Sequence, residues 1–370
     1  MPICLCLITL KIKSQLTYYY LMKTYFLINF TTFFIFANSL LSQQLLSLDS
    51  LQKVRNYPSV ELAIAEKEKA FKISLYSPSE TFSDRIFLVE NLQMLSANRL
   101  YLKYLPENLS KNTQLQWLEF RFNWIANLPE FMGDFANLQR LDLRNNWFEK
   151  MPKMLFNLAK INYLDISENK IDTIQSELLN CLNLSYLDIH KNKLKSIPDS
   201  LGKLQNLKYL DFSNNQLEKI PANLSNLKLL TYLDIGFNPL KDTNKIAKNL
   251  IAFTNLNHLG LGGLGLKKLT DTIFLVKNLE YLYLNSNKLT RISTKIENLI
   301  NLIKLDLGDN FLDSLPSNLG KLNKLEWLNL EKNSLTYVSD SLYKLQNLKF
   351  LFLGVNKFVR SEERRVGKEC

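Results

Sequence analysis

Residues capable of acid–base, nucleophilic or metal chemistry are few and far apart in this chain. Histidine occurs only at His190 and His258, and Cys181 is the one cysteine distant from both ends. These three residues share no metal-site spacing, and no nucleophile elbow, phosphate-binding loop or zinc-protease motif accompanies them. We therefore predict no catalytic residue, no metal and no cofactor, and expect a protein that is not an enzyme.

Aromatic and acidic residues instead recur in two parallel rows along the chain, mostly 23 residues apart. Aromatic side chains are the usual anchors of binding surfaces, and tyrosine adds a hydroxyl that can donate a hydrogen bond. The acidic row favours a partner with basic groups and disfavours nucleic acid. The predicted partner-binding residues are Trp117, Tyr163, Asp165, Tyr186, Asp188, Tyr209, Asp211, Tyr232, Asp234, Tyr281 and Trp327.

The net charge does not point to a nucleic-acid ligand. The chain has 46 basic and 35 acidic residues, a formal charge of +11, but part of this excess lies in the two terminal segments. In between, acids and bases alternate without a block of lysine and arginine that could follow phosphates. The expected partner is a protein or peptide, with no nucleic acid and no small-molecule cofactor.

An internal repeat must position the two rows of side chains. The unit reads L-x-x-L-x-L-x-x-N-x-L-x-x-L-P-x-x-L-x-x-L-x-x, and a truncated twelfth copy starts at Leu348. The copy at Leu230 has 26 residues, and the extra chain in Lys241–Ala252 is expected to bulge on the convex side. The eleven complete copies start at Leu92, Leu115, Leu138, Ile161, Leu184, Leu207, Leu230, Leu256, Leu279, Leu302 and Leu325.

The spacing within the unit predicts one strand and one turn for each copy. L-x-x-L-x-L alternates between inward and outward positions, as in a short strand, so successive copies can pair into a parallel sheet. Leucine at i, i+3 and i+6 after proline fits a helical or 3-10 turn. Cys181 stands where neighbouring copies have Leu158 and Leu204, so it is expected to be buried.

Asparagine at the ninth position is expected to form a buried ladder that satisfies backbone groups where the chain leaves the strand. Leu100 and Leu264 replace it in two copies, where the ladder should be interrupted. The copy with Leu264 is also rich in glycine. The ladder comprises Asn123, Asn146, Asn169, Asn192, Asn215, Asn238, Asn287, Asn310, Asn333 and Asn356.

The repeat pattern resembles the leucine-rich-repeat family over residues 92–358, and within it the Scribble-type 23-residue class. This resemblance implies an α/β solenoid, a curved array with a parallel sheet on its concave face and short helical or 3-10 turns on its convex face. It also implies that partners bind the concave face. Secreted animal members usually have a cysteine-rich cap, and its absence here suggests a bacterial protein.

The N-terminal region reads as an export signal followed by a cap. Residues 22–42 combine Lys23, an apolar stretch and small residues, as in a signal peptide, and residues 1–21 are then an over-extended gene start. The alternative is an uncleaved membrane anchor. Residues 43–91 are expected to cap the solenoid, with a helix in Val60–Ala70 and a degenerate strand in Phe71–Leu75.

The repeats occupy residues 92–359, and residues 360–370 resemble a translated sequencing adapter rather than a cap. The real protein is therefore expected to continue past Val359. The favoured hypothesis is an exported scaffold that binds a protein partner through its concave face. A second is a targeting arm of a larger enzyme or effector whose catalytic domain lies beyond Val359, and a third is a structural surface array.

Overall fold

The computed structural model describes residues 45–76, 82–241 and 250–358, which fall in two compact units, 1–54 and 55–370. In the first unit the described part contains helix α2 (Leu48–Lys53), and the Ser47 hydroxyl accepts a hydrogen bond from the Ser50 N–H at 3.1 Å. The expected gene start and signal peptide, the adapter segment and most of the Lys241–Ala252 bulge lie outside the described residues.

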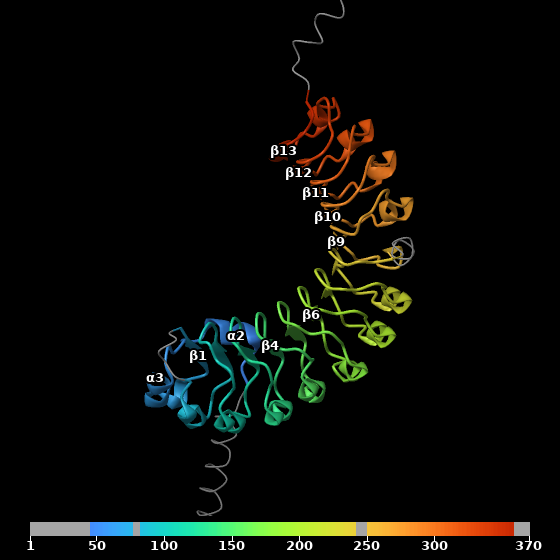
Figure 1. The fold of residues 1–370 in the computed structure, drawn as a ribbon. Coiled ribbons are helices and arrows are strands. Elements are labelled where there is room, and N and C mark those ends of the chain that lie inside the picture. The colour runs from blue at the N-terminus through green and yellow to red at the C-terminus, as the bar shows by residue number, and fades with distance from the viewer. Residues whose placement is uncertain (1–44, 77–81, 242–249, 359–370) are drawn as a thin grey trace, which may run out of the picture. The chain divides into compact units, whose positions relative to one another are not determined.

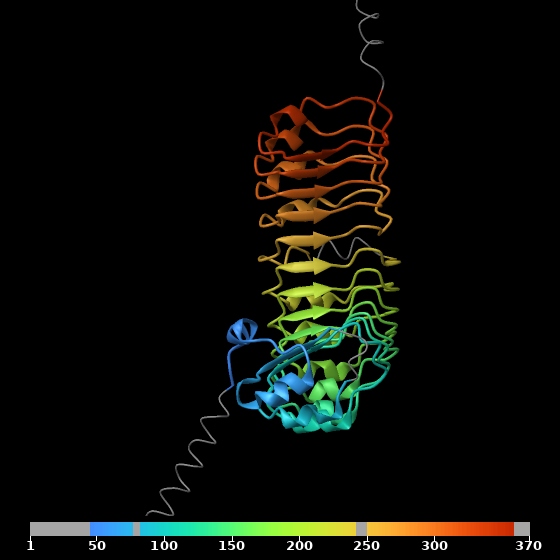
Figure 2. The same ribbon diagram turned by 90° about the vertical axis from the view of Figure 1, so that its left-hand side faces the viewer.

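In the second unit the strands form a single parallel sheet in chain order, as the repeat predicts. Each strand supplies one rung of a ladder, and consecutive rungs lie side by side (Figures 1 and 2). The strands are β1 (Lys72–Leu75), β2 (Met94–Ala97), β3 (Trp117–Glu119), β4 (Arg140–Asp142), β5 (Tyr163–Asp165), β6 (Tyr186–Asp188), β7 (Tyr209–Asp211), β8 (Tyr232–Asp234), β9 (His258–Gly260), β10 (Tyr281–Tyr283), β11 (Lys304–Asp306), β12 (Trp327–Asn329) and β13 (Phe350–Phe352).

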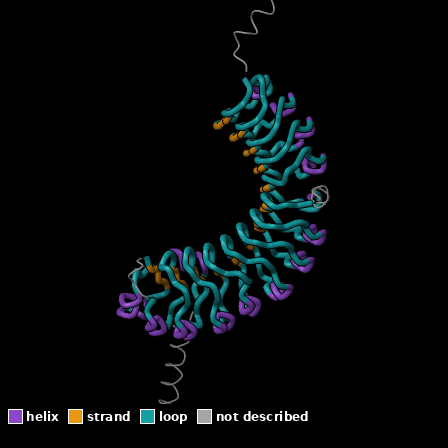
Figure 3. Tube along the Cα trace, in the orientation of Figure 1, coloured by secondary structure: helices purple, strands orange, loops and turns teal. Residues whose placement is uncertain are grey.

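Short 3-10 helices follow the strands on the convex side of this unit, while the strands line its concave side (Figure 3). Proline immediately precedes six of them, where its fixed φ and missing N–H disrupt nothing. They are η2 (Asp84–Leu88), η3 (Glu107–Lys111), η4 (Glu130–Asp134), η5 (Lys153–Asn157), η6 (Ser176–Asn180), η7 (Asp199–Lys203), η8 (Ala222–Asn226), η9 (Asp271–Leu275), η10 (Thr294–Asn298), η11 (Ser317–Lys321) and η12 (Leu342–Lys344).

The inward leucines of all coils form one continuous hydrophobic core. In the coil of β7, Leu207, Leu210 and Leu217 are fully buried, and their counterparts stack above and below them. Cys181 is buried in the same core, as expected, and its thiol donates a hydrogen bond to the Leu155 carbonyl at 3.5 Å. Burial raises the pKa of this thiol to about 11, so Cys181 is a packing residue and an unreactive one.

The asparagine ladder links each coil to the one before it, as predicted. The Asn215 amide donates to the carbonyls of Ile189 and Phe212, each at 3.0 Å, and its Oδ1 accepts from the Leu194 N–H at 3.0 Å. Ile189 and Leu194 belong to the preceding coil. One side chain therefore satisfies backbone groups in two coils, and these groups have no partner in the sheet.

The two coils that have leucine at the ladder position turn differently from the others. Arg99 and Tyr101 both have positive φ, of 61° and 58°, whereas a typical coil has one such residue. The second left-handed residue accompanies an additional bond, because the Leu100 N–H donates to Asn123 Oδ1 at 3.0 Å. The coil of Leu264 shows the same arrangement, so the next asparagine takes over part of the missing function.

The start of the second unit contains β1, preceded by α3 (Val60–Ala65) and η1 (Lys67–Lys69). The expected strand in Phe71–Leu75 is present, and it pairs in parallel with β2. The expected helix over Val60–Ala70 is too long, because Glu66 leaves the helical conformation with φ −124° and its carboxylate binds Arg55 at 2.8 Å. Within the described residues no helix has the length and apolarity needed to cross a membrane.

Candidate functional site

Aromatic rings form a stacked column along the concave face, one from each of strands β5 to β9. In-register pairing places Tyr163, Tyr186, Tyr209, Tyr232 and His258 beside one another. Centroids of successive tyrosine rings are 4.0, 4.1 and 4.0 Å apart, and the Tyr232 ring lies 3.8 Å from that of His258. Stacking covers the faces of these rings and leaves their edges at the surface, so each ring is half-buried.

Two cations extend the column at its ends. The Arg140 guanidinium lies 3.5 Å from the Tyr163 ring centroid and 4.6 Å from that of Trp117. The Lys304 ammonium lies 4.0 Å from the Trp327 ring centroid. Arg140 thus binds the rings of both neighbouring coils by cation–π attraction, whereas Lys304 binds Trp327 and, at 5.2 Å, the ring of Tyr283. The predicted Trp117 and Trp327 therefore belong to the same column as the tyrosines.

The acidic row lies deeper than the sequence suggests. Asp142, Asp165, Asp188 and Asp211 are all buried, with exposed fractions of 1–6%. The Asp211 carboxylate accepts a hydrogen bond from the backbone N–H two residues later at 2.8 Å, and the other three do the same. These four carboxylates therefore do not face solvent, although their outward strand positions favour exposure, because the turn after each strand uses the carboxylate as a backbone acceptor.

Crowding changes the protonation of this row. Burial, followed by neighbouring carboxylates, raises the pKa of Asp165 and of Asp211 to about 7. Burial likewise raises the pKa of Asp234 to about 6. Part of the row is therefore protonated near neutral pH, and the concave face has less negative charge than a count of its acids predicts.

The tyrosine hydroxyls of the column remain protonated at any physiological pH. Burial, with nearby carboxylates, raises the pKa of Tyr163 to about 12 and raises the pKa of Tyr186, Tyr209 and Tyr232 as well. The Tyr232 hydroxyl donates to Asp211 Oδ2 at 3.4 Å. The column thus offers neutral hydroxyl groups, which can hydrogen-bond a partner without carrying charge.

His190 sits beside the acidic row on the coil of β6. Its Nδ1 lies 2.7 Å from Asp188 Oδ1, and its Nε2 lies 3.7 Å from Glu168 Oε1. Burial alone would lower the pKa of His190, but the contact with Asp188 and the nearby acids raise it overall. Burial lowers the pKa of His258 to about 4, with Lys304 acting in the same direction, so His258 is a neutral ring of the column.

Asp188, His190 and Asp211 also bring three potential metal ligands together, with ligand atoms within 4.8 Å of one another. This cluster was not predicted from the sequence, because the spacing of the two histidines does not reveal that His190 lies beside acids of its own and the next coil. The contacts with Asp188 and Glu168 indicate an ion-paired imidazole, because a protonated His190 satisfies both carboxylates.

The acidic row is interrupted after β8. Gly260 stands at the acid position of β9, where a Cβ would overlap the Asp234 carboxylate. Tyr283 takes the position in β10, and Asp306 resumes the row in β11. Asn329 follows in β12, where its Oδ1 accepts the Glu331 N–H at 3.0 Å as the aspartates do. An uncharged amide can therefore replace the carboxylate in the turn.

A second aromatic group lies at the lateral edge, where the chain turns away from the strands. Tyr101, Trp124 and Trp147 form this aromatic ridge, with exposed fractions of 55%, 38% and 47%. The ring centroids of Tyr101 and Trp124 are 4.9 Å apart, and those of the two tryptophans are 5.7 Å apart. The ridge was not predicted from the sequence, although its three residues follow one another at intervals of 23 and this period could have revealed them.

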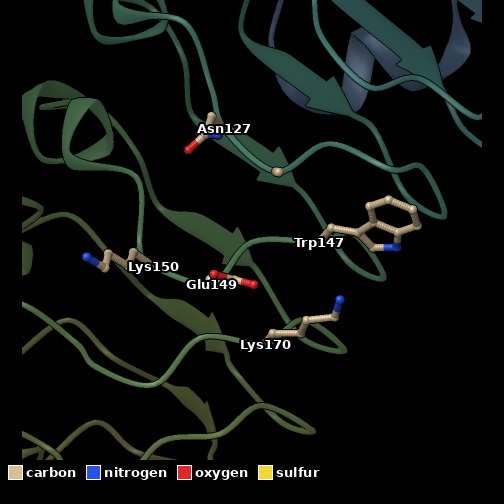
Figure 4. A pocket seen from close by; sticks show the side chains of 6 residues that line it. Asn127, Trp147, Glu149, Lys150 and Lys170 are labelled. Carbon is tan, nitrogen blue, oxygen red and sulfur yellow. The ribbon is translucent and has the colours of Figure 1, made fainter.

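A pocket opens beside Trp147, between three consecutive coils (Figure 4). Its lining combines an indole, an amide, a carboxylate and two ammonium groups. The Lys170 side chain extends toward Trp147, and its Nζ lies 5.4 Å from the indole centroid. The lining residues are Ala126, Asn127, Trp147, Glu149, Lys150 and Lys170.

Comparisons with known proteins agree with the geometry. A family model described as leucine rich repeat matches residues 136–194 and 182–240, and another of the same description matches 278–299. No curated protein matches the sequence. Among solved structures, a leucine-rich-repeat protein of Leptospira interrogans is similar, with TM-score 0.67 and 24% identity over 85% of this chain and 97% of its own.

Two further structures show the same fold. An internalin of Listeria monocytogenes has TM-score 0.59 and 22% identity over 80% of this chain and 95% of its own. The plant peptide hormone receptor RGFR1, in complex with RGF2, has TM-score 0.51 and 23% identity over 84% of this chain and 59% of its own. The chain therefore carries leucine-rich repeats that fold as an α/β solenoid around one parallel sheet.

Proposed function

We propose that this chain is an exported scaffold that binds a protein or peptide partner through its concave face. The aromatic column from Tyr163 to Trp327 is the observation that carries the proposal, and Trp117, which is only 7% exposed, supports the column through Arg140 instead of facing a partner. Rigid, half-exposed aromatic side chains lose little conformational entropy on binding and supply most of the energy at protein interfaces. The column presents such residues on consecutive strands, without a gap between Tyr163 and His258.

The chemistry of the column favours an extended partner segment. Strand neighbours repeat about every 4.8 Å, so an extended peptide running along the sheet meets a new ring and hydroxyl at each coil. The Tyr186 and Tyr232 hydroxyls donate their hydrogens to Asp188 and Asp211, so their oxygens can accept hydrogen bonds from the N–H groups of the peptide. The remaining charge of the acidic row favours basic side chains. The plant receptor of similar fold, whose structure holds RGF2, supports a peptide partner.

Origin and export belong to the same proposal. The signal-peptide pattern in residues 22–42 and the similar bacterial folds support an exported bacterial protein. The 23-residue unit supports the Scribble-type class, and residues 43–91 are proposed as the N-terminal cap. The fold is typically a binding scaffold and not an enzyme. A targeting arm for a catalytic domain beyond Val359 is the alternative, and sequencing the gene past that codon distinguishes the two.

Replacement of two central rings tests the proposal. A display library of random 12-residue peptides is selected on the wild-type chain, and the affinity of each enriched peptide is measured by calorimetry. Tyr186→Ala with Tyr209→Ala removes the middle of the column, so the concave-face peptides should bind at least about tenfold more weakly. The half-buried rings are not core residues, so the melting temperature should change little.

The phenylalanine pair provides the matched control. Tyr186→Phe with Tyr209→Phe keeps the stacked rings and removes only the hydroxyls, so we expect a smaller loss of affinity than with alanine. Enriched peptides that bind the folded alanine variant as tightly as the wild type would contradict a concave binding site.

A further inference from the structure

The aromatic ridge is not required by the turn that carries it. Tyr101, Trp124 and Trp147 occupy the tenth position of their repeats, where later coils carry Lys170 and Lys193. The coils of Lys170 and Lys193 have the same backbone turn as those of Trp124 and Trp147, with one positive-φ residue each, and their lysines are exposed. The fold therefore does not require an aromatic residue at this position, because lysine is compatible with the same turn. An exposed group of large aromatic residues that the fold does not require marks an interaction site.

Stacking determines which ligand the ridge can accept. The two indoles are nearly parallel, with an interplanar angle of 20° and centroids 5.7 Å apart, and Lys170 approaches the ring of Trp147. Neighbouring groups thus occupy the ring faces, and the outer edges are free. A sugar ring needs an open aromatic face, whereas apolar side chains of a peptide can pack across such edges.

The charges around the ridge favour an acidic partner. Lys150 and Lys170 line the pocket beside Trp147, and Glu149 is the one acid in its lining. Lys193 and Lys195 continue the same edge on the next coil, where both are exposed. Electrostatic complementarity steers association and selects partners, so this edge should attract a segment with acidic side chains.

From these observations we propose that the aromatic ridge and its pocket form a second docking site, for an acidic peptide segment of a partner protein. An apolar side chain of the segment packs across Trp124 and Trp147. A neighbouring carboxylate enters the pocket beside Trp147 and pairs with Lys170, while Lys150 adds positive charge on the other side of Glu149. The site is separate from the concave face, so the scaffold can hold two partners, and this inference stands independently of the concave-face proposal.

The peptide library selected on the wild-type chain also tests this site. Ridge-dependent peptides should be rich in aspartate or glutamate next to apolar residues, and they should quench tryptophan fluorescence when they bind. Lys150→Glu with Lys170→Glu reverses the local charge without touching the core, so their affinity should fall at least about tenfold. Trp147→Ala should have a similar effect.

Controls separate the two docking sites. Phe311→Ala removes an exposed aromatic residue at the same repeat position that has no aromatic neighbour in its row, so it should leave the affinity unchanged. The Tyr186→Ala and Tyr209→Ala pair should also leave ridge-dependent peptides bound. Raising the salt from about 0.05 to about 0.5 M should weaken them, because exposed charges are screened.

The proposal is overturned if no selected peptide loses affinity on the folded Lys150→Glu and Lys170→Glu variant, or if the peptides that do are basic. Peptides affected equally by the ridge and the tyrosine substitutions would also overturn it, since they would indicate one continuous site. If the concave-face variants do not change binding, the ridge proposal still stands, because different variants report on the two sites.

Discussion

Strands β5 to β8 and strands β9 to β11 have the same backbone and different surfaces. Both regions pair in parallel with the same register, and both have a buried leucine at the centre of every strand. Their outward residues differ, because the first region reads Tyr-Leu-Asp four times and the second reads His-Leu-Gly, Tyr-Leu-Tyr and Lys-Leu-Asp. The framework therefore constrains the inward side chains and leaves the outward ones free to vary.

This difference separates structural from functional repetition. The asparagine amide makes equivalent bonds in both regions, since Asn310 donates to Leu284 and Leu307 at 3.0 and 3.1 Å as Asn215 does in its own coil. The tyrosine column and the acidic row are regular only in the first region. Because the fold does not demand this regularity, we propose β5 to β8 as the centre of the binding surface.

The largest expected effects fall on the shared framework. Leu210→Ala in β7 and Leu305→Ala in β11 each remove a fully buried side chain and leave a cavity. We expect each to lower the free energy of unfolding by about 2–5 kcal/mol. Chemical denaturation of both variants measures the free energy of unfolding. A difference between the two losses larger than the usual spread for such substitutions would show that the two regions are not equivalent.

Substitutions in the asparagine ladder should lower the stability by less than the leucine substitutions, and by similar amounts in the two regions. Asn215→Ala and Asn310→Ala each leave buried carbonyl and N–H groups without a partner, which costs about 1–3 kcal/mol. Thermal melts of the two variants against the wild type provide the measurement. A melting curve that coincides with that of the wild type in either case would contradict the structural role of the ladder.

The acidic rows should distinguish the regions by pH. The pKa of Asp165 and of Asp211 is raised to about 7, so their protonated forms favour folding below about pH 4, and that contribution is lost as the pH rises through 7. Asp165→Asn with Asp211→Asn should therefore stabilise the protein at pH 8 by about 1 kcal/mol or more. Asn329 shows that an amide fits this position.

Asp306→Asn in β11 is the matched comparison. Burial also raises the pKa of Asp306, but this carboxyl lies next to Asn329 and Tyr283 instead of a run of acids. Its replacement should change the pH dependence of the melting temperature less than the Asp165 and Asp211 pair does. An equal change would mean that crowding of carboxyls in β5 to β8 is not the cause.

The sequence predicts the framework well because one residue type at one position decides each part of it. The leucine spacing gave the strand register, the proline marked the start of the 3-10 turn, and asparagine marked the ladder. Leu100 and Leu264 correctly mark its interruptions, although the second positive-φ residue and the additional hydrogen bond that compensate for them could not be foreseen. The boundary of α3 at Ala65 depends on the contacts of Glu66, which are not visible in the sequence.

The surface was predicted less completely, because it depends on side-chain conformation. The period places Asp165 and Asp211 on the concave face, but only the structure shows that they turn inward to bind the backbone. The period likewise places Arg140 in the aromatic row, but only the structure shows that its guanidinium continues the stack. The predicted tyrosines do lie together, and their role in binding remains a prediction.

The most direct test of the concave face compares the two regions in binding. The affinity of the concave-face peptides is measured by calorimetry for Tyr186→Ala with Tyr209→Ala and for Tyr281→Ala with Tyr283→Ala. We predict at least about a tenfold loss for the first pair, a smaller loss for the second, and similar melting temperatures. Unchanged affinity for the first pair, or a larger loss for the second, would contradict a binding surface centred on β5 to β8.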